Sequence, residues 1–131
     1  MIVDDSTLVR ARLVVLLSRS PQIEVVGLAR TAPEAIERAA QLMPDVIILD
    51  IQLPGASGIS IIRQLKEMDP TPIVCMLTNF ASIQVEMKCK EAGADYFFDK
   101  SAEFEQIIPV IELSGTQPTS DTKATVRKSE Q

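Results

Sequence analysis

Short apolar runs, rich in β-branched residues, alternate along this chain with segments in which apolar side chains recur every three or four positions. The second kind of spacing is typical of helices that bury one face. Regular alternation of the two indicates an α/β domain built on a parallel sheet. The expected strands are residues 1–3, 23–29, 45–49, 73–77 and 96–98. The runs at 45–49 and 73–77 are almost wholly apolar, which predicts central strands covered on both faces.

Local signals mark where the expected helices begin and end. Ser6 is placed to cap the first helix, and Gly93 is placed to end the fourth. Thr31 and Glu34 form a capping box, with Pro33 early in the first turn, where its missing amide costs least. The expected inward stripes are Val9, Leu13 and Leu16; Ile36, Ala39, Ala40 and Met43; Ile61, Ile62, Leu65 and Met68; Ala81, Val85, Cys89 and Ala92; and Phe104, Ile107, Ile108 and Ile111.

Five β-α units of this size predict an α/β fold with an open, doubly wound, five-stranded parallel sheet. The expected strand order is 2-1-3-4-5, as in the flavodoxin-like three-layer sandwich. A chain of 131 residues is long enough for one domain with a single core, and we expect that domain over residues 1–114. Residues 115–131 are mostly polar, with Val126 as the only large apolar side chain, so we expect a flexible tail or linker there.

Composition excludes several classes of function. A net charge of −5 disfavours direct binding to nucleic acid, and no apolar run approaches the roughly 20 residues that a membrane helix needs. The start of the chain has no secretion signal, so a cytoplasmic location is expected. The absence of histidine excludes His-based general base catalysis and imidazole zinc sites. Cys75 and Cys89 lie in apolar patterns and are expected to be buried free thiols.

Polar residues end or follow four of the expected strands: Asp4 and Asp5 after the first, Asp50 after the third, Thr78 after the fourth and Lys100 after the fifth. In a doubly wound sheet, ligands bind beside the carboxyl ends of the strands, where the strand order reverses. Three close carboxylates repel one another unless one is neutral or a cation lies among them. Oxygen ligands without His or Cys favour Mg²⁺. The pattern therefore predicts a magnesium and phosphoryl site.

Asp50, alone at the end of a central strand, is the best candidate for a nucleophile that attacks phosphorus. Lys100 and Thr78 supply an ammonium and a hydroxyl for the charge that develops there. Asp5 is expected to bind the metal directly and Asp4 to support it, through water. Taken alone, each residue has a plainer reading, because an Asp-Asp pair often only caps a helix. Their joint placement at four strand ends is what favours a functional site.

Four motifs occur in order within residues 1–114: Asp4-Asp5-Ser6, Leu49-Asp50-Ile51-Gln52-Leu53-Pro54-Gly55, Leu77-Thr78, and Gly93-Ala94-Asp95-Tyr96 followed by Lys100. Together they resemble the receiver domain of bacterial two-component response regulators. The resemblance implies that Asp50 accepts a phosphoryl group from a sensor histidine kinase or a phosphotransfer protein. It also implies Mg²⁺ held by Asp5, Asp50 and the backbone carbonyl of Gln52.

The resemblance further implies a switch. Thr78 would be the switch hydroxyl and Phe97 the switch aromatic, and the face formed by the fourth helix, fifth strand and fifth helix would change its affinity for an output partner. The same face would serve a homodimer. Such a change is a population shift driven by charge-assisted hydrogen bonds. The protein would then be a phosphoacceptor switch rather than a turnover enzyme.

The chain departs from the family pattern at several positions. Ser101 follows Lys100 where proline is frequent, so we expect a trans peptide bond, with Ser101 as a cap for the last helix. Asn79 follows the switch threonine, where its side chain would narrow access to the phosphoryl group. Pro109 predicts a kink or an early break in the last helix. Only residues 1–3 precede Asp4, which is short for a central strand and suggests that the native gene begins earlier.

Three alternatives stay open. The chain could be the receiver fragment of a larger DNA-binding transcriptional regulator, although no helix-turn-helix follows residue 115. A magnesium-dependent phosphatase with an aspartate nucleophile usually carries a second acid two residues after the nucleophile, where this chain has Gln52. A flavodoxin-like cofactor binder would need a phosphate-cradling loop after the first strand, where this chain has two carboxylates.

Overall fold

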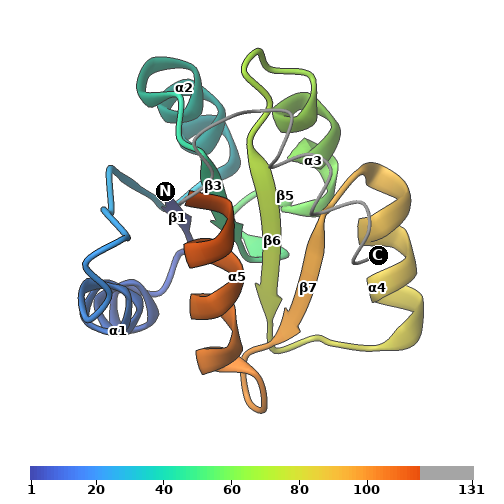
Figure 1. Ribbon diagram of the computed structural model, residues 1–131. Coiled ribbons are helices and arrows are strands. Elements are labelled where there is room, and N and C mark those ends of the chain that lie inside the picture. Colours follow the sequence, from blue (N-terminus) through green and yellow to red (C-terminus); the bar gives the residue numbers. More distant parts are fainter. Residues whose placement is uncertain (116–131) are drawn as a thin grey trace.

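The computed structural model describes residues 1–115 and contains a five-stranded parallel sheet flanked by helices (Figure 1). The sheet is formed by β1 (Ile2–Val3), β2 (Leu28–Ala29), β3 (Val46–Leu49), β6 (Ile73–Thr78) and β7 (Tyr96–Asp99). Its order is β2-β1-β3-β6-β7. This is the predicted doubly wound order 2-1-3-4-5, and it places the reversal of strand order beside β1 and β3.

The helices are α1 (Thr7–Ser18), α2 (Ala32–Leu42), α3 (Ile59–Lys66), α4 (Ile83–Ala92) and α5 (Ile107–Gly115), with a short 3-10 helix η1 (Phe104–Gln106) before α5. The predicted caps are confirmed. The Ser6 hydroxyl accepts a hydrogen bond from Val9 N, and the Thr31 hydroxyl accepts one from Glu34 N. Gly93 ends α4 with φ 118°, a left-handed conformation that glycine adopts without strain.

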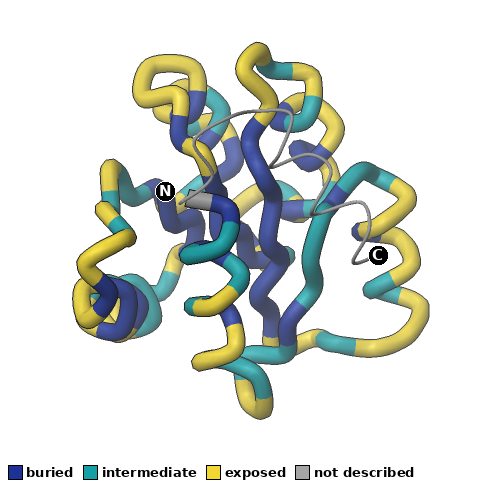
Figure 2. The backbone as a smooth tube through the Cα atoms, viewed as in Figure 1, coloured by how far each residue is buried: buried dark blue, intermediate teal, exposed yellow. Residues whose placement is uncertain are grey.

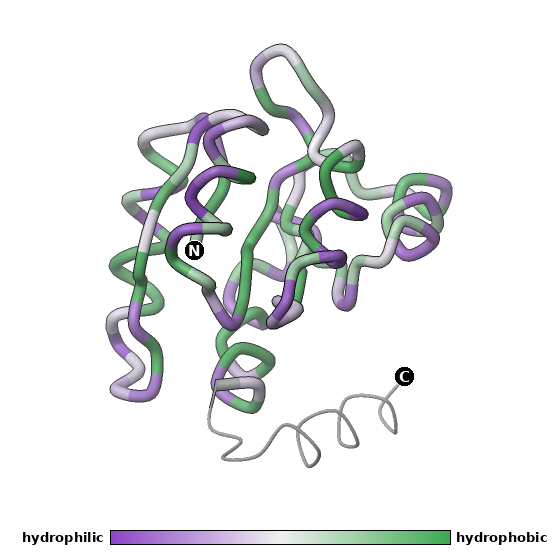
Figure 3. The backbone as a smooth tube through the Cα atoms, turned by 90° about the horizontal axis from the view of Figure 1, so that it is seen from above, coloured by the Kyte–Doolittle hydropathy of each residue, from purple (hydrophilic) through white to green (hydrophobic). Residues whose placement is uncertain are grey.

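Two apolar clusters lie on the two faces of the sheet. One packs α2, α3 and α4 against side chains such as Val3, Leu49 and Met76. The other packs α1 and α5 against side chains such as Ile48 and Leu77. The central strands are therefore buried on both faces (Figure 2). Figure 3 shows hydrophobic strands between helices whose residues alternate between hydrophilic and hydrophobic. Both cysteines are buried and free, as predicted.

Several boundaries differ from the sequence prediction. The predicted strand 23–29 is reduced to Leu28–Ala29, because β2 pairs only with the two residues of β1. After β3 the chain forms a small antiparallel hairpin of β4 (Gln52–Leu53) and β5 (Ala56–Ser57), which is not among the predicted strands. The fourth helix begins at Ile83 and so excludes Ala81, the first residue of its predicted stripe, because Ser82 caps it by accepting from Val85 N.

The stripe predicted for α2 was partly wrong. Ala32, Ala35 and Ala39 are the buried residues of this helix, whereas Ala40 and Met43 are exposed. Met43 lies beyond the last turn in a left-handed conformation, with φ 48°. The chain therefore leaves the helical spacing before Met43 can reach the sheet.

Pro109 lies in the first turn of α5, where its missing amide removes no bond within that helix. The 3-10 turn η1 precedes it, so the break predicted from this proline falls at the start of the helix. The predicted tail, 115–131, lies outside the described residues apart from Gly115. Within residues 1–115, no helix has the length and apolar character required to cross a membrane.

Candidate functional site

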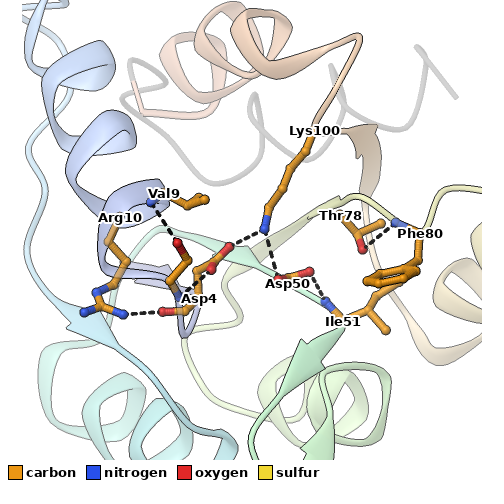
Figure 4. Close-up of polar contacts among 9 residues, drawn as sticks. Asp4, Val9, Arg10, Asp50, Ile51, Thr78, Phe80 and Lys100 are labelled. Carbon is orange, nitrogen blue, oxygen red and sulfur yellow. Dashed lines mark hydrogen bonds and ion pairs between the residues drawn. The ribbon is translucent and has the colours of Figure 1, made fainter.

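The predicted polar residues meet at one edge of the sheet (Figure 4). Asp4 follows β1, Asp50 follows β3, Thr78 ends β6 and Lys100 follows β7. Because all of these strands are parallel, their carboxyl ends lie at the same edge. Asp4, Asp5, Asp50 and Lys100 line a cleft of about 600 Å³.

Lys100 lies between two carboxylates. Its Nζ is 2.6 Å from Asp4 Oδ2 and 3.0 Å from Asp50 Oδ2. The three side chains are only 8%, 4% and 8% exposed, respectively. One ammonium therefore bridges the loops after the two strands at which the strand order reverses.

Backbone amides hold the remaining carboxylate oxygens. Asp4 Oδ1 accepts a hydrogen bond from Ser6 N at 2.9 Å, and Asp50 Oδ1 accepts one from Ile51 N at 2.7 Å. The Asp4 side chain thus turns back onto the chain just before α1. Both carboxylates are fixed in orientation by short bonds to charged or backbone donors.

Burial and charge compete at this site. Burial, with a smaller contribution from the charge of Asp4, raises the pKa of Asp50 against the opposing effects of Lys100 and the Ile51 amide. Burial also acts to lower the pKa of Lys100, but the hydrogen bonds and charges of Asp4 and Asp50 together outweigh it and raise that pKa. The lysine is therefore held in its charged form, while the Asp50 carboxylate carries an electrostatic cost.

The acidic cluster fits a divalent cation with hard oxygen ligands. One carboxylate oxygen from each of Asp4, Asp5 and Asp50 lies within 4.8 Å of the others. Asp5 is exposed, whereas Asp4 and Asp50 are buried. Three carboxylates against the single Lys100 ammonium leave an excess of negative charge at the cleft, which a cation would offset. Gln52, whose carbonyl was predicted as a ligand, lines the same cleft from the β4–β5 hairpin.

Comparison with known proteins agrees with this geometry. The family model described as "Response regulator receiver domain" matches residues 1–112. This chain belongs to the response regulator receiver family. The order of the sheet and the acidic cluster at its carboxyl edge are thus those of a receiver domain. It follows that the chain is a component of two-component signalling.

The most similar curated relatives include two larger enzymes. A protein-glutamate methylesterase/protein-glutamine glutaminase of Syntrophus aciditrophicus is 40% identical over 96 residues, which is 72% of this chain and 27% of that protein. The corresponding protein of Alkalilimnicola ehrlichii is 34% identical over 113 residues, or 82% of this chain and 29% of that protein. The chain therefore spans less than a third of the length of these relatives.

Solved structures cover the receiver domain more completely. A two-component response regulator of the LuxR family from Aurantimonas sp. SI85-9A1 is 32% identical with a TM-score of 0.79, over 99% of this chain and 94% of that one. The response regulator domain of Thermotoga maritima CheB is 31% identical with a TM-score of 0.74, over 84% and 87%. A Burkholderia pseudomallei response regulator with a phosphorylated aspartic acid, 27% identical over 98% and 70%, has a TM-score of 0.73.

The two residues predicted for switching do not line this receiver cleft. Thr78 is fully buried, and its Oγ1 accepts a hydrogen bond from Phe80 N at 3.1 Å. Asn79 and Phe80 line the cleft instead. Phe97 is half-buried and packs beside α4, where it lines a second cavity with Glu86. Neither Thr78 nor Phe97 is therefore among the residues that line the cleft of Asp50.

Two residues that support the receiver site were missed by sequence reasoning. Gly58 packs so closely against the Asp50 carbonyl oxygen that a Cβ at this position would lie 2.0 Å from it. A larger residue could be accommodated here only if the backbone moved. Arg10 Nη1 donates to the Asp4 carbonyl at 2.6 Å. Gly58 lies in a segment with other turn residues, and Arg10 lies in an expected helix. Nothing in the sequence therefore distinguished either residue from an ordinary turn glycine or a surface arginine.

The turn after Lys100 differs from its predicted form in one respect. The Lys100–Ser101 peptide bond is trans, as predicted. Among the described residues, the one cis peptide bond is Asp69–Pro70. Ser101 does not cap the last helix. Its hydroxyl and its amide both donate to Asp99 Oδ1, and η1 begins after Glu103 without a side-chain cap. The serine is drawn back toward β7 by a carboxylate two residues earlier.

Proposed function

We propose that this receiver domain accepts a phosphoryl group on Asp50 from a sensor histidine kinase or a phosphotransfer protein, in a reaction that depends on Mg²⁺. Phosphorylation would then switch the face formed by α4, β7 and α5, which controls an output partner. One observation carries the proposal: Asp50 is a buried carboxylate at the cleft edge, bonded to Lys100 and within 4.8 Å of two further carboxylates. Receiver domains as a family interact with histidine kinases.

The proposed step is an attack by an Asp50 carboxylate oxygen on the phosphorus of the donor. An O–P bond forms, and the bond from phosphorus to the donor atom breaks, so the electron pair leaves with the donor. The product is an acyl phosphate. Lys100 is bonded to Asp50 Oδ2 before the reaction, so its ammonium is in place to neutralise the charge that the phosphoryl oxygens bring.

Asp5, Asp50 and the Gln52 carbonyl are the proposed direct ligands of Mg²⁺, with Asp4 acting through water. When bound, the ion would neutralise phosphoryl oxygens and the excess carboxylate charge. Asp4 already accepts from Lys100 and from Ser6 N. Asp5 is exposed and therefore accessible to an ion, which supports a direct role for it.

The proposed switch uses Thr78 and Phe97. The Thr78 hydroxyl accepts from Phe80 N in the present state, and it would give up that bond to donate to a phosphoryl oxygen. Phe97 lies on β7 beside α4 with room around it in the cavity that Glu86 and Lys90 also line. Its half-buried ring could then move inward as the β6–α4 loop shifts, which would change the surface offered to an output partner or to a second copy.

The proposal has consequences for the rest of the chain. We propose residues 1–114 as the receiver domain and 115–131 as a tail or linker, and we propose a cytoplasmic protein without catalytic turnover. In a second form of this proposal, the chain is the receiver part of a larger regulator that carries an output domain, such as a DNA-binding domain. It is supported by the curated relatives, because the matched region spans only 27% and 29% of their length.

The test is treatment of the purified chain with acetyl phosphate and Mg²⁺, followed by intact-mass measurement and peptide mapping. We expect addition of one phosphoryl group on Asp50, dependent on Mg²⁺. Asp50→Asn should remove it, and Asp45→Asn, at the opposite end of β3, should not. Size measurement after beryllofluoride treatment would report a dimer. Two results would show that the proposed function is wrong: a wild-type chain that stays unmodified, or an Asp50→Asn variant that is modified as well as wild type.

A further inference from the structure

The turn after β7 holds the backbone of Lys100 from both sides. On one side, Lys100 N donates to the Thr78 carbonyl at 2.9 Å, which continues the pairing of β7 with β6. On the other side, Ser101 N donates to Asp99 Oδ1 at 2.9 Å, and Ser101 Oγ donates to the same oxygen at 2.7 Å. Lys100 is thus the central residue of a turn closed by the side chain of Asp99.

Asp99 is itself held by the chain that follows. Asp99 N donates to Glu103 Oε1 at 2.9 Å, and Glu103 N donates back to the Asp99 carbonyl at 2.7 Å. The hydroxyl and amide of Ser101 also lower the pKa of the Asp99 carboxyl, so the carboxylate stays charged. The anchor of the turn is therefore a fixed, ionised acceptor.

Hydrogen bonds, rather than packing, keep this turn in shape. Ser101 and Ala102 are both exposed, so no apolar contact covers the outer side of the turn. The lysine that the turn carries is different, because its side chain is only 8% exposed and reaches Asp4 and Asp50 at the cleft (Figure 4). A long, flexible stem places its ammonium accurately only where the backbone at its base is held.

We infer that Asp99, acting through Ser101, is a positioning residue that aims the Lys100 ammonium at Asp4 and Asp50. Asp99 does not contact the cleft, and its effect on phosphorylation passes through Lys100 alone. The expected effect of Asp99 on phosphoryl transfer rests on the proposed function. The placement of the ammonium is a property of the unphosphorylated protein and can be measured separately.

The experiment compares Asp99→Ala, which removes the acceptor, with Asp99→Asn, which keeps an oxygen acceptor without the charge. Ser101→Ala removes the hydroxyl donor and keeps the amide donor. Asp45→Ala is the matched control, an exposed aspartate at the far end of β3. Three readouts are taken on the full chain: the side-chain ammonium NMR signal of Lys100, the affinity for beryllofluoride with Mg²⁺, and the melting temperature.

We expect Asp99→Ala to lose the slowly exchanging Lys100 ammonium signal and to weaken beryllofluoride binding about tenfold, as for the loss of hydrogen bonds to a charged group. Ser101→Ala should weaken binding about threefold, Asp99→Asn should stay closer to wild type than Asp99→Ala, and the control should be unchanged. Melting temperatures should remain within a few degrees, because the turn is exposed.

Two results would overturn the inference. One is an unchanged Lys100 signal in Asp99→Ala. The other is a loss in Asp99→Asn as large as in Asp99→Ala, which would assign the effect to charge. If wild type itself binds no beryllofluoride and takes no phosphoryl group, the proposed function fails. The ammonium signal still decides the positioning role in that case.

Discussion

Two lysine–aspartate contacts lie at opposite edges of the same sheet and differ in their charge balance. At the amino edge, Lys66 Nζ lies 2.6 Å from Asp95 Oδ2 and donates to the Pro72 carbonyl at 2.8 Å. The same Asp95 oxygen also accepts from Val74 N at 2.8 Å. At the carboxyl edge, Lys100 is shared between Asp4 and Asp50.

The difference separates a balanced contact from an unbalanced one. The Lys66–Asp95 pair joins one charge of each sign and ties the end of α3 to the residues just before β6 and β7. The cluster at the cleft has one ammonium against three carboxylates. Such an excess of negative charge lowers the stability of the fold and favours the binding of a cation that offsets it.

The largest effect is expected from Lys100→Met. In metal-free buffer, this substitution leaves Asp4 and Asp50 buried without their ammonium, which should cost about 3 kcal/mol of unfolding free energy. Saturating Mg²⁺ should restore most of that loss, because the ion replaces the missing positive charge. Denaturant unfolding with and without Mg²⁺ measures both. A loss that Mg²⁺ leaves untouched would contradict the unbalanced-cluster interpretation.

A smaller loss is expected from Lys66→Met. The pair is about a fifth exposed on each side (22% and 21%), so the substitution should cost about 2 kcal/mol. Mg²⁺ should not restore it, and phosphorylation of Asp50 should proceed at nearly the wild-type rate. The same unfolding titration and a labelling time course check these points. Rescue by Mg²⁺ here would remove the distinction between the two edges.

The smallest effect, of opposite sign, is expected from Asp50→Asn in metal-free buffer. Burial raises the pKa of Asp50 above its ordinary value of 3.8, so the folded state binds its proton more tightly than the unfolded state. Wild-type stability should therefore fall as pH rises from about 3.8 through the raised pKa. The variant should be more stable than wild type at pH 7 and equal to it near pH 3. Equal stability of the two proteins at pH 7 would contradict the cost assigned to the ionised carboxylate.

The elements that the sequence predicted well are those with signals contained in a few neighbouring residues. The runs that became β3 and β6 are apolar throughout, because both faces of the sheet are covered. Ser6, Thr31 and Gly93 act as caps through bonds to residues one turn away. The placement of Asp50 and Lys100 was also predictable, because parallel strands bring their carboxyl ends together.

The features that the sequence did not predict depend on partners far along the chain. The run 23–29 has the composition of a longer strand, but β1 offers it only two pairing residues. Ser101 was expected to cap a helix, yet Asp99 holds it in a turn. Gly58 approaches the Asp50 carbonyl only because the β4–β5 hairpin folds back over the end of β3.

The sequence by itself determined the order of the strands, the edge at which the carboxylates gather and the family to which the chain belongs. These follow from patterns of apolar residues and from polar residues at fixed places after them. Only the tertiary structure decided how those charges are paired. The structure shows which oxygens of Asp4 and Asp50 contact Lys100 and which turn positions that lysine. These contacts join residues up to about a hundred positions apart in the chain.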